Sequence, residues 1–282
     1  MSEQVHTTEP HISPQSSTQD CIWHTTLGSP SNPPLLLLHG IFCSHLEFFP
    51  LIPFLQPHFY VILVDLSGHS RSRSPTLSTQ HIPEITSTLA SLIRSVSPTG
   101  SAHVAGLSYG GFVGLELARR HPDVVLSLFA SGAPPFEGKE RFFASRPRLL
   151  YCVIASTNHI PDSLYWWFSA KVGVQKHAEL RAESKRNLTF VLLKQGYGDV
   201  LEITLKEVGE VGVRTLAVAG GRQDSVDVTR RMGTALRGKG GRAVVVRKAI
   251  HAWDLQFPEL FAEGVRRWIQ EEELPEEYEE LL

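Results

Sequence analysis

The chain has 282 residues, of which 42% are hydrophobic, and a formal net charge of −2. This length suits one large α/β domain with an insertion. The charge balance gives no basic excess that would attract nucleic acid or an anionic membrane, and no run of about 18 apolar residues could span a bilayer. We therefore expect a small-molecule substrate and no nucleic-acid or membrane partner, and the oligomeric state stays open.

The N-terminal residues 1–19 are rich in Ser, Thr, Gln and Pro and are predicted to be disordered. They lack the basic stretch and apolar core of a signal peptide. The cysteines Cys21, Cys43 and Cys152 are odd in number and far apart, so they indicate neither a metal site nor a disulfide framework. This usage favours a reducing, cytoplasmic location, and we expect no metal or other cofactor.

The first strong element is a run of four leucines at residues 35–38, bounded by two prolines and by His39-Gly40. Such a run predicts a strand that is buried on both faces, as in a parallel sheet. The His-Gly ending allows a sharp turn, so the backbone N–H of Ile41 can face a site at the end of the strand. Phe42 is a candidate for lining that site. Cys43 also follows the turn, but we interpret it as an uninvolved thiol because a serine occupies the nucleophile position described next.

A second buried strand at residues 60–64 leads into a polar loop, and a third short strand at 102–105 leads into Gly-Leu-Ser-Tyr-Gly at 106–110. The residues that follow, 111–120, have the apolar spacing of a helix. G-x-S-x-G between a strand and a helix is the nucleophile elbow, in which glycines flank a strained serine. The turn aims the hydroxyl of Ser108 toward a helix N-terminus, which favours negative charge. The pentapeptide predicts acyl chemistry.

Between residues 135 and 210 the sequence reads as helical, with turn signals at 158–162 and 196–199. A helix is predicted to start at Pro161-Asp162-Ser163, and four aromatic residues follow at 165–168. Two interpretations of these aromatics stay open. Either two are core residues and two cover the seam between this segment and the sheet, or Trp166 or Trp167 lines an apolar pocket above Ser108.

Two further strands, at 215–219 and 243–246, each precede a residue suited to activate a serine. Asp224 follows the first and His251 follows the second, and an imidazole that titrates near pH 6.5 can take the serine proton. Asp227 is a rival acid, but its expected role is to cap a helix that begins near Val228. The other histidines are read as structural, His39 as a support of its own loop, and His69 and His103 as structural side chains. The acidic end, residues 271–282, is predicted to be solvated, with an interaction tail as the alternative.

These strands, turns and polar residues together resemble the α/β-hydrolase superfamily, in the serine-nucleophile branch with a helical cap. The resemblance covers about residues 20–270. It implies a mostly parallel central sheet flanked by helices, with a core at 20–134 and 211–270 and a cap at 135–210. Ser70 and Ile250 stand where glycine is expected or common, and both departures concern loop shape.

The resemblance also implies the roles of the site residues. Ser108 matches the nucleophile, Asp224 the acid and His251 the base, in the chain order that this fold imposes. The backbone N–H groups of Ile41 and Tyr109 would form the oxyanion hole.

The main hypothesis is a serine hydrolase that cleaves a carboxylic ester or thioester of a small apolar molecule through an acyl-enzyme. Members of the superfamily also cleave carbon–carbon bonds of β-dicarbonyl or polyketide-like compounds, or catalyse cyclisations, and the fold does not separate these reactions. A ligand receptor with slow turnover is the alternative from a different class. Epoxide hydrolase and dehalogenase chemistry are disfavoured because those relatives carry aspartate at the position of Ser108.

Overall fold

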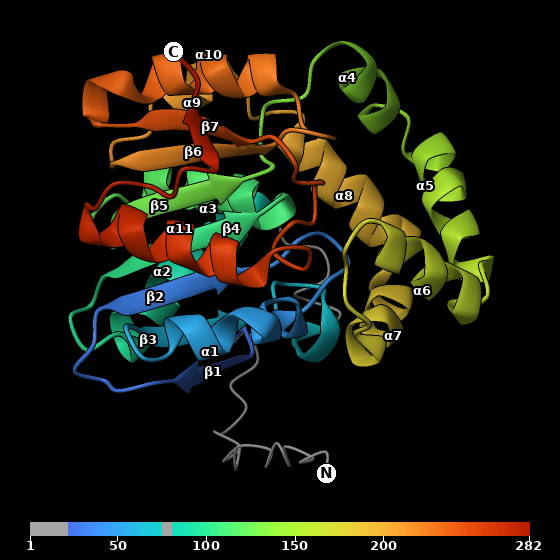
Figure 1. The fold of residues 1–282 in the computed structure, drawn as a ribbon, viewed down its shortest axis with the longest axis horizontal. Helices are drawn as coiled ribbons and strands as arrows, with labels where there is room; N and C mark the ends of the chain where they lie inside the picture. The colour runs from blue at the N-terminus through green and yellow to red at the C-terminus, as the bar shows by residue number, and fades with distance from the viewer. Residues whose placement is uncertain (1–21, 75–80) are drawn as a thin grey trace.

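The computed structural model describes residues 22–74 and 81–282, in which eight strands form one sheet with the order β1-β3-β2-β4-β5-β6-β7-β8. The strands from β2 to β7 run parallel, and the edge strands β1 and β8 are antiparallel to their neighbours (Figure 1). The expectations for residues 1–19 and for Cys21 lie outside the described residues. The strand bounds are β1 His24–Leu27, β2 Pro34–Leu38, β3 Tyr60–Val64, β4 Ala102–Leu107, β5 Val125–Ser131, β6 Thr215–Gly220, β7 Arg242–Val246 and β8 Tyr278–Glu280.

The four-leucine run forms an interior strand of the sheet, because β2 lies between β3 and β4. Leu36 and Leu38 point into the hydrophobic core on one face, while Leu35 and Leu37 point into the core on the other. All four are completely buried. Side chains alternate across a strand, so a central strand covered on both faces requires apolar residues at every position.

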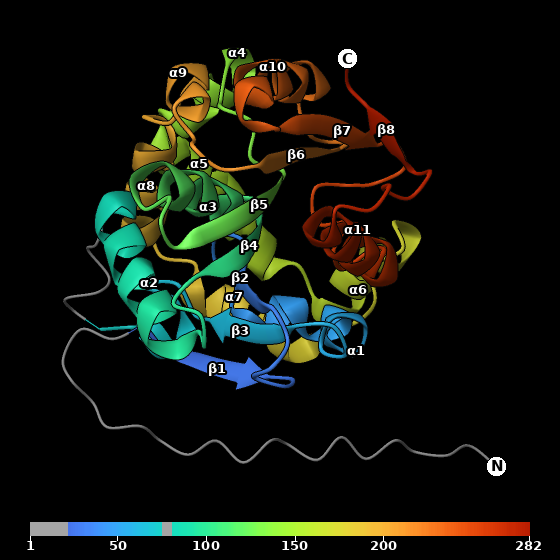
Figure 2. The same cartoon turned by 90° about the vertical axis from the view of Figure 1, so that its left-hand side faces the viewer.

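Helices cover both faces of the sheet, as the two perpendicular views show (Figures 1 and 2). The helices α2, α3 and α10 pack on one face, and α1 and α11 pack on the other. The arrangement brings the carboxyl ends of all parallel strands to one edge, which is where ligands bind in such sheets. The bounds are α1 Ile52–Leu55, α2 Ile82–Val96, α3 Tyr109–Arg120, α10 Val226–Leu236 and α11 Pro258–Gln270.

A helical segment between β5 and β6 lies over that edge of the sheet (Figure 1). Its small apolar core joins Leu188, Leu192 and Leu193 to Phe42 of the loop after β2. The last helix, α9, instead packs beside α10 on the sheet. We call the helices from α4 to α8 the cap. The bounds are α4 Gly138–Ala144, α5 Pro147–Ser156, α6 Asp162–Lys171, α7 Ala178–Asn187, α8 Phe190–Val200 and α9 Leu205–Gly209.

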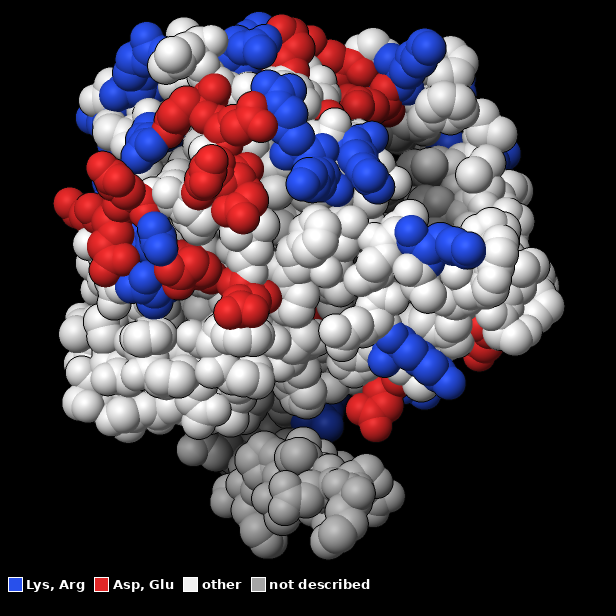
Figure 3. All heavy atoms as spheres, in the orientation of Figure 1, with Lys and Arg blue, Asp and Glu red and all other residues white. Residues whose placement is uncertain are grey.

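Two features differ from the sequence predictions. The turn predicted at residues 196–199 lies inside α8. The reason is close packing, since a Cβ atom on Gly196 would lie 3.0 Å from Cδ1 of Ile41. The acidic end is not simply solvated, because Tyr278 and Leu281 are buried and β8 pairs with β7. The acidic side chains gather on the outside of this region and of α11 (Figure 3).

Candidate active site

Ser108 connects β4 to α3 in a backbone conformation that is rare for a side-chain-bearing residue, with φ 54° and ψ −119°. Glycines on either side make this turn possible. A Cβ atom on Gly110 would lie 1.9 Å from the carbonyl oxygen of Leu38, and one on Gly106 would lie 2.3 Å from the carbonyl oxygen of Gly110. Only residues without a Cβ fit these two positions. The strained serine therefore lies at the carboxyl edge of the sheet, at the N-terminus of α3.

Asp224 and His251 follow β6 and β7 and contact each other at the same edge. Nδ1 of His251 lies 2.6 Å from Oδ1 of Asp224. The backbone N–H of Gly220 donates to the other carboxylate oxygen at 2.7 Å, so the carboxylate has a fixed orientation. Gly132, at the end of β5, has φ +60°, and a Cβ atom there would lie 2.8 Å from Cε1 of His251. The glycine thus lets the imidazole approach the strand that neighbours Ser108.

The electrostatic surroundings favour a histidine that holds a proton on Nδ1. The side chain of Asp224 is 4% exposed, whereas that of His251 keeps 40% of its surface open to solvent. Desolvation alone would lower the pKa of His251, but the hydrogen bond and charge of Asp224, together with the charge of Glu47, raise it above its usual value. With Nδ1–H directed at Asp224, Nε2 of His251 is left free to accept a proton.

Asp227 takes no part in this contact, and its predicted role as a helix cap is wrong. The helix α10 begins at Val226, so Asp227 lies inside its first turn and not at the cap position. Its exposed carboxylate pairs with Arg231 at 3.3 Å. An acid in the first turn also suits the helix dipole.

The loop after β2 contains a backbone N–H that has no hydrogen-bond partner among the described residues. The N–H of Gly40 donates to Oε2 of Glu47 at 2.7 Å, and the N–H of Phe42 donates to Nε2 of His69 at 3.1 Å. The N–H of Ile41, between them, makes no hydrogen bond to a described residue. Tyr109 is the first residue of α3, a position whose N–H has no partner within the helix. Both N–H groups are thus without a hydrogen-bond partner among the described residues, and both residues line the cavity beside Ser108.

Buried histidines brace this loop. His39 donates from Nδ1 to the carbonyl of Gly40 at 2.8 Å and accepts the N–H of Leu66 at Nε2, 2.9 Å away. His69 accepts from Phe42, and its other ring nitrogen lies 3.1 Å from the carbonyl of Ser67. Burial lowers the pKa of His39 to about 4 and that of His69 to about 3, so both rings are neutral at pH 7. His103 lies apart from the site, against Ser127 at 2.8 Å.

Sequence reasoning missed Asn187, a completely buried cap residue at the end of α7. Its amide nitrogen donates to the carbonyl oxygens of Phe42 and Cys43, at 3.1 and 2.8 Å. Its amide oxygen accepts the backbone N–H of Ser70 at 2.8 Å. Phe42 and Ser70 both have positive φ, 65° and 41°. One cap side chain thus holds two strained core loops, and nothing in the local sequence marks it.

Two buried acids next to the site were also missed. Glu47 is 2% exposed, and Asp254 is completely buried with no hydrogen-bond partner for its carboxyl oxygens among the described residues. Burial raises the pKa of both carboxyls, and the Glu47 charge raises that of Asp254 further. The only local signal was a single glutamate within a run of apolar residues at 46–52.

Cys43 is half-buried, and burial and Glu47 raise the pKa of its thiol, as suits an unreactive thiol.

A small cavity of about 20 Å³ opens directly beside Ser108. That volume holds about one water molecule. Phe136 and Tyr197 stack over it with ring centroids 5.9 Å apart. The residues that line the cavity are Ile41, Ser108, Tyr109, Phe112, Phe136, Gly196, Tyr197 and Val200.

The three residues expected to line a substrate pocket are not among those that line this cavity. Phe42 is buried in the small core of the cap, Trp166 is half-buried on α6, and the side chain of Trp167 is 54% exposed. No residue of α6 is buried, so neither interpretation of the aromatic run describes its position. The residues that close over Ser108 come instead from α8 and from the segment after β5. Single aromatics in those segments gave no signal to distinguish them from ordinary core residues.

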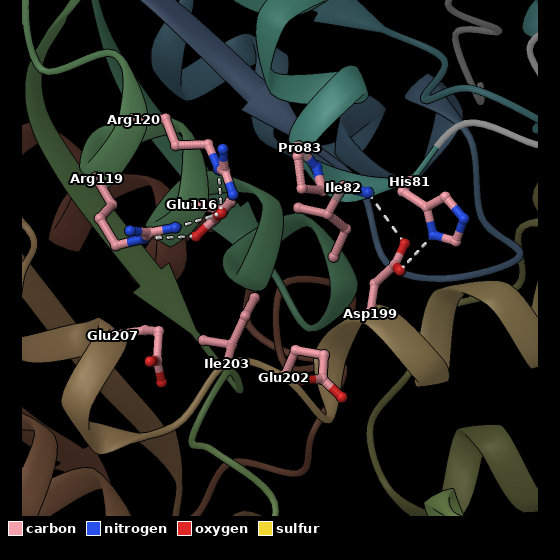
Figure 4. Close-up of a pocket in the computed structure, with 10 residues that line it drawn as sticks. All are labelled: His81, Ile82, Pro83, Glu116, Arg119, Arg120, Asp199, Glu202, Ile203 and Glu207. Atoms are coloured by element: carbon pink, nitrogen blue, oxygen red, sulfur yellow. Dashed lines mark hydrogen bonds and ion pairs between the residues drawn. The ribbon is translucent and has the colours of Figure 1, made fainter.

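A larger groove of about 370 Å³ lies between α2, α3, α8 and α9, away from these groups (Figure 4). Several of the side chains that line it form ion pairs with one another. His81 contacts Asp199 at 2.7 Å, and the carboxylate of Glu116 pairs with both Arg119 and Arg120. Asp199 lies on α8, the helix that covers the small cavity, so this groove borders the cap without containing a nucleophile–base pair.

Among the described residues, no helix is long and apolar enough to cross a membrane.

Comparison with known proteins agrees with this fold. A sequence profile of the alpha/beta hydrolase fold matches residues 33–197. An AB hydrolase superfamily protein of Gibberella zeae is 30% identical over 257 residues, which cover 89% of this chain and 85% of the relative. The chain therefore belongs to the α/β-hydrolase fold family, which confirms the predicted fold class.

More distant relatives carry names that denote ester cleavage. A pimeloyl-[acyl-carrier protein] methyl ester esterase of Aeromonas hydrophila is 25% identical over 253 residues, covering 84% of this chain and 95% of the esterase. The crystal structure of the enol-lactonase from Burkholderia xenovorans LB400 superposes with a TM-score of 0.71 at 19% identity, covering 88% of this chain and 96% of the lactonase. The lactonase shows the shared fold, and the esterase together with the family membership indicates a hydrolase enzyme.

Proposed function

We propose that this protein hydrolyses carboxylic esters or thioesters with a small apolar acyl group, and that Ser108, His251 and Asp224 carry the reaction. The observation that carries the proposal is the 2.6 Å contact between His251 and Asp224 at the sheet edge where the strained Ser108 lies. A serine hydroxyl is a weak nucleophile at neutral pH and requires a base, and a base requires a group that fixes its tautomer.

The reaction would begin when Nε2 of His251 takes the proton of Ser108 as Oγ attacks the carbonyl carbon. The electrons of the carbonyl π bond move to its oxygen, and the N–H groups of Ile41 and Tyr109 hold the resulting anion. The intermediate collapses and expels the alcohol or thiol, which takes the proton from His251. Water then attacks the acyl-enzyme by the same steps and releases the carboxylic acid and free Ser108.

The small size and the apolar lining of the space beside Ser108 favour a short, apolar acyl group over a long one. The space beside Ser108 is about 20 Å³, and Phe136 and Tyr197 limit it with apolar rings. Charged groups are absent from the residues that line it. A substrate larger than a water molecule would need α8 or these two rings to move. An apolar acyl chain is the group that such a wall would accept.

Covalent labelling tests the proposal. A fluorophosphonate probe should modify Ser108 with a stoichiometry near one, located by mass spectrometry of the labelled peptide, and Ser108→Ala should abolish the modification. A series of p-nitrophenyl esters and acyl thioesters of rising chain length should then show a burst of product followed by steady turnover, highest for short chains. Labelling without turnover of any ester or thioester would contradict hydrolysis and favour a ligand receptor. Absence of labelling would contradict the serine mechanism itself.

A further inference from the structure

The outer side of the cap exposes an unusual number of large apolar side chains. Of the thirteen large hydrophobic residues that are exposed among the described residues, eight lie in residues 138–176. Seven of them lie on α4, α5 and α6, which follow one another along the side of the cap away from the sheet, and the eighth directly follows α6 (Figure 1). We call these eight residues the outer cap face: Phe142, Phe143, Leu149, Val153, Leu164, Trp167, Phe168 and Val172.

The apolar residues of α6 form a regular stripe. Trp167 and Phe168 follow Leu164 by three and four residues, so the three share one side of the helix, and their exposed fractions are 54, 55 and 44%. Val172, the residue that follows α6, is 37% exposed. The half-buried Trp166 lies on the opposite side of the helix. A helix that directs its apolar stripe outward has a surface suited to another apolar environment.

The helix α5 is apolar on two sides. Leu150 and Ile154 pack against the small core of the cap. Leu149 and Val153, one position earlier in each turn, are 45 and 55% exposed. The contacts of Leu150 and Ile154 hold α5 against the cap, whereas Leu149 and Val153 are largely open to solvent. The apolar character of the outer cap face is therefore not explained by the packing of the cap.

Basic residues outnumber acidic ones in the segment that carries the outer cap face. Residues 138–176 contain six Lys or Arg and two Asp or Glu, a net charge of +4, so the rest of the chain carries −6. Two of these cations lie over exposed rings, with Arg146 at 3.6 Å from the ring centroid of Phe142 and Lys171 at 5.2 Å from that of Trp167. Figure 3 shows the same separation, with acidic side chains gathered over α11 and mostly uncharged and basic side chains over the cap. The whole-chain charge of −2 conceals this asymmetry.

We propose that the outer cap face binds an anionic lipid surface. Exposed Trp, Phe and Leu side chains accompanied by Lys and Arg suit the boundary between headgroups and acyl chains, because the rings enter the apolar layer while the long basic side chains extend to the phosphates. A second copy of the chain is a poorer occupant, since two faces of net charge +4 would repel each other. This surface lies outside the proposed catalytic groups, so the inference does not depend on the proposed reaction.

Flotation of the full chain with vesicles tests the inference. The protein should float with vesicles of phosphatidylcholine and phosphatidylserine, and much less with phosphatidylcholine alone. The double substitution Leu164→Asp with Phe168→Asp should lower the partition coefficient at least about tenfold, because it places charges on the exposed stripe. Phe54→Asp is the matched control, since Phe54 is an exposed aromatic of α1, at 38%, outside the cap. It should leave the partition coefficient unchanged within about twofold.

Two further measurements distinguish a lipid surface from a protein partner. Replacing Lys171 and Lys176 by Gln should lower the partition coefficient by about 25-fold, taking about fivefold for each cation near the surface. Brominated acyl chains should quench tryptophan fluorescence in the natural protein, and this quenching should be lost in Trp167→Phe. Three results would overturn the inference: no flotation with phosphatidylserine vesicles, equal loss in the Phe54→Asp control, or a concentration-dependent dimer in analytical ultracentrifugation that the Leu164/Phe168 pair abolishes.

Discussion

Replacing Asn187 by Ala should slow the reaction although Asn187 does not touch the space beside Ser108. The substitution removes the donors to the carbonyls of Phe42 and Cys43 and the acceptor for the N–H of Ser70. Each buried polar group that loses its partner costs about 1–3 kcal/mol unless water replaces it, and a residue held at positive φ stores about 1–3 kcal/mol. Phe42 would then relax and move the adjoining peptide of Ile41. We expect kcat to fall roughly 10- to 100-fold, less than the roughly 10²–10³ lost when an oxyanion donor is removed outright.

The assay must separate a displaced oxyanion donor from a merely weaker fold. We expect KM to change less than about threefold, and the affinity for a boronic acid that mimics the tetrahedral intermediate to fall in parallel with kcat. Glu183→Gln is the matched control, because Glu183 lies on the same helix and accepts the hydroxyl of Ser70 at 2.8 Å without reaching residues 42–43. If Asn187→Ala lowers the melting temperature but leaves kcat and boronic-acid affinity equal to those of the control, the reasoning is refuted.

The remaining predictions concern the proposed catalytic groups and the cavity. Ser108→Ala and His251→Ala should each lower kcat by roughly 10³–10⁶ without unfolding the protein, and the double variant should be little worse than either single one, because the two groups act as a unit; normal turnover in Ser108→Ala would exclude an acyl-enzyme. Asp224→Asn should lower kcat by about 10³–10⁴, whereas Asp227→Asn should cost less than about tenfold because that carboxylate is exposed and paired with an arginine. His251 must be neutral to act as a base and Asp224 raises its pKa, so kcat/KM should rise with pH through that raised pKa, and the rise should move to lower pH in Asp224→Asn. Tyr197→Ala removes a ring that closes the cavity and should shift the kcat/KM ratio of long to short p-nitrophenyl esters at least about tenfold toward long chains; an unchanged ratio would place the acyl group elsewhere.

Sequence reasoning succeeded where a feature depends on neighbouring residues. The run at 35–38 is a central strand because four consecutive leucines suit no other place in a sheet with two covered faces. The turn at Ser108 was predictable because glycines at 106 and 110 allow contacts of 2.3 and 1.9 Å that a Cβ atom would forbid. These local signals predicted a strand buried on both faces and the strand–turn–helix at Ser108, whereas the mostly parallel sheet was implied by the resemblance to the α/β-hydrolase superfamily.

Sequence reasoning failed where the position of a residue depends on a contact with a segment that is distant in the sequence. Gly196 suggested a turn, but it lies in α8 because a helix tolerates glycine where it must approach another segment closely, here the side chain of Ile41. The aromatic run at 165–168 suggested a pocket because its apolar character is high, yet its orientation depends on how α6 packs, which periodicity over four residues does not determine. Asn187 contacts Phe42 and Ser70, which precede it in the sequence by 145 and 117 positions, so no local pattern could reveal these contacts.

The strained residues of the chain show why the cap belongs to the site. Among the described residues, four non-glycine residues have positive φ, and three of them, Phe42, Ser70 and Ser108, lie in the loops that meet at the carboxyl edge of the sheet. Such conformations persist only when the surrounding structure holds them. Tight glycine packing within the core holds Ser108 in its conformation. Phe42 and Ser70 are instead both hydrogen-bonded to one cap side chain, that of Asn187. A cap that moved to admit substrate would therefore loosen the loop that carries the N–H of Ile41, and a cap that closed would restore it.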